Sequence, residues 1–102
     1  MTGADLRRAD LRNCDFTETC LEGANLSEAD LSGTELFRGD LRSAKLHRTI
    51  LRGTVLRQAN LRGADFSGSD LALASFREID LTGVTLDGAD LKNAVVRDIR
   101  KA

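Results

Sequence analysis

Large apolar residues recur at every fifth position of this sequence, from Leu6 to Val96. All nineteen of these central positions are apolar, and fifteen of them are leucine. The residue two positions earlier is small, except at Ile79 and Val84, and the residue directly before the centre is Asp or Asn in eleven cases. Eight of the nine glycines stand two positions after a centre position. The chain is therefore one five-residue unit repeated, and this period has to be interpreted before any helix or strand is assigned.

A period of five fits neither an amphipathic helix nor a plain strand. Five residues turn an α-helix by about 500°, so the centres would spread around its whole circumference. The faces of a strand alternate every second residue, and five is odd. A short extended piece followed by a corner does fit, because the small residue and the centre then point inward and the residue between them points outward. Glycine suits such a corner because it tolerates positive φ.

The motifs Ala29-Asp30-Leu31-Ser32-Gly33 and Ala59-Asn60-Leu61-Arg62-Gly63 resemble the repeat of the pentapeptide repeat family. The resemblance covers essentially the whole chain. It implies an all-β fold, a right-handed quadrilateral β-helix (solenoid) in which four pentapeptides form one coil, so that this chain has about five coils.

Stacking by twenty residues sorts the centres onto four walls. The first wall carries Leu21, Leu41, Leu61 and Leu81, and the second carries Leu6, Leu26, Leu46, Phe66 and Leu86. The third carries Leu11, Leu31, Leu51, Leu71 and Leu91, and the fourth carries Phe16, Leu36, Leu56, Phe76 and Val96.

We expect one domain, with the β-helix over residues 4–98 and short uncapped ends at residues 1–3 and 99–102. Solenoids normally end in polar caps, so their lack favours a piece cut from a longer protein. Open strand edges invite pairing with another chain, and members of the family often dimerise through a C-terminal element. An end-on homodimer is the expectation, although the tail here is too short for the helices that some members use.

Composition narrows the possible partners and the location. The 15 basic and 16 acidic residues give a net charge of −1, so direct nucleic-acid binding is not expected. No long apolar run could span a membrane, and the N-terminus lacks a signal-peptide core. Cys14 is expected to point inward and Cys20 outward, so they should not pair. Two free thiols suit a reducing compartment, and we expect a cytoplasmic protein.

Few residues could support catalysis. His47 is the only histidine, and it follows a centre, so its side chain should face solvent. No set of residues has zinc spacing, and no glycine-rich loop leads from a strand into a helix. Cys20 could serve in a redox or metal site, but a tolerated surface thiol is the simpler interpretation. We expect no enzymatic activity, no cofactor and no bound metal.

Some outward positions depart from the repeat and could form a partner surface. The apolar members of this set are Phe37, Ile50, Val55, Leu73 and Val95. Three arginines should stack on the fourth wall, Arg57, Arg77 and Arg97, and they need an anion or nearby acids such as Glu78 and Asp98 to offset their repulsion.

The leading hypothesis is a non-enzymatic repeat scaffold that binds another macromolecule, a protein in particular, through a flat wall. An alternative that the resemblance implies is a DNA mimic that modulates a topoisomerase, as in quinolone resistance. An outward column of acids on the third wall could imitate phosphates: Asp10, Asp30, Asp70 and Asp90. The nearly neutral charge and the neighbouring arginines oppose that role. A third possibility is a structural or spacer module of a larger protein.

Overall fold

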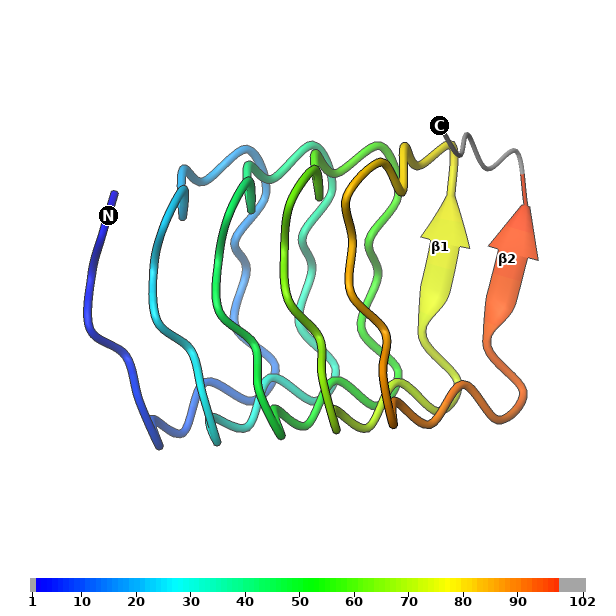
Figure 1. Cartoon of the computed structure of the whole chain (residues 1–102), viewed down its shortest axis with the longest axis horizontal. Coiled ribbons are helices and arrows are strands. Elements are labelled where there is room, and N and C mark those ends of the chain that lie inside the picture. The colour runs from blue at the N-terminus through cyan, green and yellow to red at the C-terminus, as the bar shows by residue number, and fades with distance from the viewer. Residues whose placement is uncertain (1, 98–102) are drawn as a thin grey trace.

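The backbone winds as a coil whose turns stack along one axis (Figure 1). This computed structural model describes residues 2–97. At every fifth position from Asp5 to Asp70, a residue pairs in parallel with the residue twenty positions later. Two short strands, β1 (Ser75–Arg77) and β2 (Val95–Arg97), pair in the same way, with Phe76 opposite Val96. No helix occurs among residues 2–97, and none of them could therefore cross a membrane as a helix.

Each coil bends at the residue two positions after the centre. Every such residue from Gly3 to Asn93 has positive φ, whether or not it is glycine. The bend is closed by a backbone hydrogen bond such as that from the Ala29 amide to the Leu26 carbonyl, 3.0 Å. Positive φ at the third residue is typical of a type II turn. This geometry explains the glycines of the repeat, since other L-residues lose roughly 1–2 kcal/mol there.

The Asp or Asn before each centre has a structural role. Its side-chain oxygen accepts a hydrogen bond from the backbone amide two residues later, as in Asp30 with Ser32 (3.0 Å) and Asp70 with Ala72 (3.1 Å). The same contact forms at Asp5, Asp10, Asp15, Asn25, Asp40, Asn60, Asp65, Asp80 and Asp90. Asx contacts of this kind stabilise turns, so the consensus acid of the repeat secures the following corner.

The centres fill the interior of the coil. Leu31, Leu51 and Phe66 are fully buried, and Phe16 and Phe76 add bulk on the fourth wall. Burying one such side chain contributes about 1.5–3 kcal/mol. Ile79 is an exception to the small-residue rule of the repeat, and the structure shows how the coil accommodates it. Ile79 is 1% exposed and belongs to the core, because its position points inward and Gly39 and Ala59 precede it in the same column.

The coils at the two ends are less well covered. Leu91 is 39% exposed and Val96 is 52% exposed, while Leu6 and Leu11 are half-buried. The expected end of the repeat near residue 98 and the tail at 99–102 lie outside the described residues.

Candidate functional site

The fourth wall departs most from the repeat on its outer face. Its first outward column contains Asp15, Glu35, Val55, Ser75 and Val95, joined by successive parallel pairings. Its second outward column contains Thr17, Phe37, Arg57, Arg77 and Arg97. We call the outer face formed by Phe37, Val55, Arg57, Ser75 and Arg77 the fourth-wall surface. From Val55 onward these two columns contain no acid.

Part of the fourth-wall surface lacks the hydrogen bond from a backbone amide to an Asp or Asn side chain that secures the corners elsewhere. At Val55 the consensus acid is missing, and at Glu35 its place is taken by the longer glutamate. Within residues 2–97, no side chain accepts a hydrogen bond from the amide of Phe37 or Arg57. Glu35 and Val55 therefore do not secure the following corner, whereas Asp15 on the same wall does.

Two guanidinium groups lie close to the ring of Phe37. The Cζ atom of Arg38 is 5.1 Å from the centroid of the Phe37 ring, and that of Arg57 is 5.7 Å away. Cation–π contacts at such distances contribute about 0.5–1 kcal/mol at exposed sites. The contacts hold a half-buried aromatic ring and two cations in one place on the surface.

A polar ladder runs along the corner beside this wall. The Arg38 Nε group donates to Gln58 Oε1 at 3.1 Å, and Gln58 Nε2 donates to Glu78 Oε2 at 2.6 Å. Arg57 forms an ion pair with Glu78 at 3.3 Å. The hydrogen bond from Gln58 and the contact with Arg57 lower the pKa of Glu78. The expectation that Glu78 offsets the arginine column is thus confirmed for Arg57, whereas Asp98 lies outside the described residues.

The other predicted surface residues are only partly brought together. Leu73 is 62% exposed at the corner that leads into the fourth wall, and Val95 is 42% exposed in its first column. Ile50 is 38% exposed but lies on the third wall, between Asp30 and Asp70. Phe37 and Val55 are half-buried rather than fully exposed. For Arg97 the structure describes the backbone only.

Two of the four acids in the outward column of the third wall, Asp10 and Asp70, form ion pairs. Arg12 pairs with Asp10 at 2.9 Å, and its hydrogen bonds lower the pKa of that carboxyl. Arg52 reaches Asp70 at 3.1 Å. Since the Asp side chains also accept backbone amides, the column is explained by the fold and does not need a phosphate-like role.

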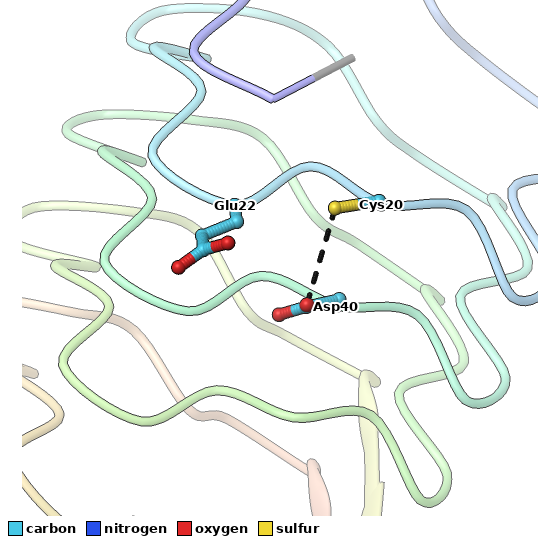
Figure 2. A group of neighbouring side chains, drawn as sticks. All are labelled: Cys20, Glu22 and Asp40. Carbon is cyan, nitrogen blue, oxygen red and sulfur yellow. Dashed lines mark hydrogen bonds between the residues drawn. The ribbon is translucent and has the colours of Figure 1, made fainter.

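A cluster that the sequence did not reveal lies on the first wall (Figure 2). Ligand atoms of Cys20, Glu22 and Asp40 lie within 4.8 Å of one another, and Figure 2 shows the contact from Cys20 to Asp40, 3.9 Å. The signal was available, because Cys20 and Glu22 flank one centre and Asp40 follows Cys20 by twenty positions.

The guanidinium of Arg42 offsets the repulsion between the carboxylates of Glu22 and Asp40. Its guanidinium lies 2.7 Å from Asp40 and 3.5 Å from Glu22, and it lowers the pKa of Asp40. The positive charge that two carboxylates need is therefore supplied by the protein, which disfavours a metal site here. Cys14 and Cys20 are both free, as expected. His47 is exposed, and its Nε2 atom lies 2.9 Å from a carboxylate oxygen of Asp65.

The family model of pentapeptide repeats matches this chain with eight copies, over residues 1–39, 40–77 and 59–98. The chain is a pentapeptide repeat protein. Proteins of this family fold as right-handed quadrilateral β-helices and are generally non-enzymatic scaffolds. Membership agrees with the parallel pairing of residues twenty apart.

Solved pentapeptide repeat proteins share this fold. The chain is 26% identical to alr5209 from Nostoc PCC 7120, with a TM-score of 0.61, and the alignment covers 96% of this chain and 84% of that one. It is 23% identical to a protein of the Arabidopsis thaliana thylakoid lumen, with a TM-score of 0.63, covering 91% of this chain but only 58% of that one.

QnrB1, a plasmid-mediated fluoroquinolone resistance protein, is 24% identical, with a TM-score of 0.40 over 90% of this chain and 60% of that one. That similarity is too low to support an argument about function. No curated protein sequence matches the chain.

Proposed function

We propose that this pentapeptide repeat chain is a scaffold that binds another protein through the fourth-wall surface. The observation that carries the proposal is the loss of the corner-securing acid at Val55, next to Phe37 and Arg57. Apolar and cationic side chains stand there in place of residues that stabilise the fold. Their apolar and cationic chemistry is what supports a partner-binding role for this surface.

The chemistry of the surface favours an acidic partner segment that also carries apolar side chains. Arg77 forms no ion pair within the part of the chain that the structure describes, and Glu78, whose pKa its charge helps to lower, is already paired with Arg57. Aromatic and arginine side chains are enriched at protein interfaces. A carboxylate of the partner could bind Arg77 while an apolar side chain contacts Val55 and the Phe37 ring. Exposed Leu73, at the adjoining corner, extends the apolar part of the surface.

The proposal can be tested by affinity capture from the cells of origin with three immobilised proteins. These are the parent, a Val55→Asp, Arg77→Glu variant, and a control with Ile50→Asp on the third wall. Ile50 occupies the same outward position of the repeat as Val55 but on the third wall, so the control introduces a charge without altering the fourth wall. We expect a partner that is captured by the parent and by the control and is lost with the fourth-wall variant. Circular dichroism checks that all three are folded.

Other results of the capture experiment distinguish the proposal from a structural or spacer role and from DNA mimicry. A partner that the fourth-wall variant retains would contradict the proposal. Capture of nothing by any of the three would favour the structural or spacer role. DNA mimicry receives less support than either, because the acids of the third wall are paired with arginines and with backbone amides. Unchanged gyrase supercoiling in the presence of purified protein would exclude it. The two free thiols support a cytoplasmic location as part of this proposal.

A further inference from the structure

The outer face of the fourth wall changes its charge along the axis of the coil. Its two outward columns contain acids only in the first two coils, at Asp15 and Glu35. They contain bases only from Arg57 onward. Phe37 and Val55, both half-buried, lie where the two halves meet. This face is therefore acidic in its first half, basic in its second half and apolar in between.

Most of these charges lack an opposite charge within the chain. Among residues 2–97, neither Asp15 nor Glu35 forms an ion pair with a base, and Arg77 forms none with an acid. Arg57 is paired with Glu78 at 3.3 Å. Asp15, Glu35 and Arg77 are all exposed. Two acids and one arginine on the same flat face are thus available to a partner whose charges run in the opposite order.

A second copy of the chain presents its charges in that order when the two copies face each other in opposite directions. A half-turn about a line that crosses the wall, between the coil of Phe37 and the coil of Arg57, sets two fourth walls face to face. Each outward column then faces its own counterpart, and the order of the coils is reversed. The acidic half of each copy lies opposite the basic half of the other. A half-turn about a line parallel to the coil axis would place acids near acids and arginines near arginines, so the charges select the antiparallel pairing.

The register of this pairing brings specific residues together. Glu35 lies diagonally opposite Arg57 of the second copy, and Asp15 lies diagonally opposite Arg77 of the second copy. The offset is that between two outward neighbours of one strand, about 6.8 Å, and the long arginine side chains can cross it. Phe37 faces Arg57 of the second copy, which repeats between the chains the cation–π contact that exists within one chain at 5.7 Å. Every contact occurs twice, because a two-fold interface is self-complementary.

We propose that two copies of this chain pair face to face and antiparallel through their fourth walls. The pairing rests on the proposed function and names its partner, since the acidic and partly apolar segment that the fourth-wall surface requires is the first half of the same wall. Phe37 and Val55 of both copies form an apolar centre with charges around it, as in other protein interfaces. The contact involves neither end of the coil.

The size of the wall sets the strength of the dimer. Four coils cover about 19 Å along the axis, since neighbouring coils lie about 4.8 Å apart. The contact therefore belongs to the small interfaces, below roughly 1,200 Å² of total buried surface, that form weak complexes. Because its ion pairs are exposed at the rim, added salt should weaken it further.

Reversing the charge of one half at a time tests the pairing. In a dimer of identical chains, Glu35→Arg sets two bases against each other and Arg57→Glu sets two acids against each other. Sedimentation velocity of the whole chain is run at low salt from about 5 to about 500 µM, because association follows mass action. The parent should pass from 11.1 kDa to twice that mass and no further. Each variant alone should require a concentration at least about tenfold higher for the same degree of association.

Mixing the two variants provides the decisive readout. In a dimer of one Glu35→Arg chain and one Arg57→Glu chain, both diagonal pairs again join opposite charges. An equimolar mixture should therefore dimerise as well as the parent, although neither variant does so alone. Arg52→Glu is the matched control, because it makes the same change of charge at the equivalent position of the third wall. This control should dimerise as the parent does.

The remaining outcomes overturn the pairing. A parent that stays at 11.1 kDa overturns it without deciding the proposed function, because affinity capture of a different protein tests that function separately. Variants that associate as well as the parent, or an Arg52→Glu control that does not, place the contact elsewhere. If circular dichroism shows that a variant is unfolded, nuclear magnetic resonance of the parent decides. The amide signals of Phe37, Val55 and Arg57 must then shift with protein concentration, and that of Ile50 must not.

Discussion

Leu51 and Leu91 occupy the same position of the repeat on the same wall, yet only one of them is fully buried. Leu51 has a coil on either side, whereas Leu91 is 39% exposed in the last coil. The five-residue pattern therefore determines which side chains point inward, and the neighbouring coils determine how much each side chain contributes to the stability of the fold. A solenoid is stabilised by interfaces between adjacent repeats, so its ends should be weaker than its middle.

The largest expected effect compares these two leucines directly. Leu51→Ala should lower the free energy of unfolding by about 3 kcal/mol, since it leaves a cavity in a filled core. Leu91→Ala should cost less than about 1 kcal/mol, because its side chain is already partly in water. Urea denaturation at low protein concentration measures both. Equal losses would show that the last coil is covered as well as the middle.

A smaller effect is expected from a buried hydroxyl. Thr54 is fully buried and its Oγ1 donates to the Leu31 carbonyl at 2.9 Å. Thr54→Val should lower the free energy of unfolding by about 1 kcal/mol, because it removes this hydrogen bond inside the core. Thr82→Val is the control in the last coil, where the half-buried hydroxyl bonds to Asp80 on the outer face. Its effect on the urea midpoint should be smaller, and a larger one would contradict the distinction between middle and end.

At a corner, the effect of a substitution on the free energy of unfolding should depend on the φ of that residue and not on the coil that contains it. Leu73 has a φ of 62° and a largely exposed side chain. Leu73→Asn should raise the free energy of unfolding by about 0.5 kcal/mol, because Asn tolerates this conformation better. Gly53→Ala, at a φ of 68° with nothing within 4 Å of the added methyl, should lower it by about 1 kcal/mol. Thermal melts of both variants check the two signs, and a destabilised Leu73→Asn would mean that Leu73 packs against the protein.

The smallest effect concerns exposed ion pairs, where the end and the middle should behave alike. Hydrogen bonds from Arg7 lower the pKa of Asp5 to about 2, and Arg42 lowers the pKa of Asp40. A carboxyl whose pKa is lowered in the folded chain contributes its full stabilisation above the pKa of about 3.9 that it has in the unfolded chain. This contribution is lost as the pH falls through the pKa of the folded chain. The loss at Asp5 should therefore lie between about pH 4 and pH 2.

Carboxyl titration by nuclear magnetic resonance tests this expectation. Arg7→Gln should raise the pKa of Asp5 toward its usual range and leave that of Asp40 unchanged. Titration of Asp5 in the parent at its usual value would show that the Arg7 contact does not persist in solution. If the pKa values of Asp5 and Asp40 are both lowered, the lower stability of the end coils arises from their core and not from the ion pairs on their outer walls.

Much of the fold could be predicted because one period controls it. Inward centres, corners with positive φ and pairing by twenty residues all follow from the spacing of leucine, glycine and Asp or Asn. The sequence alone could not show how Ile79, an exception to the small-residue rule, fits: the structure buries it in the same column as Gly39 and Ala59.

The candidate surface was harder to predict than the fold. The sequence identified Phe37 and the arginine column, but not the contacts that hold them. Arg38, Gln58 and Glu78 are twenty residues apart, and their ladder depends on rotamers that the repeat does not specify. The walls themselves could be predicted, since the spacing of twenty residues places Ile50 on the third wall and Val55 on the fourth, as the structure has them.

Parallel pairing at a fixed distance of twenty residues limits which insertions and deletions this protein can accept. A single inserted residue would turn every later aspartate inward and every later leucine outward. Five inserted residues would preserve the core but move each later surface residue to the next wall, which would separate Phe37 from Arg57. Only whole coils can be gained or lost without changing the surface. Duplication and loss of twenty-residue segments is thus the route by which such chains can differ in length while keeping a binding face intact.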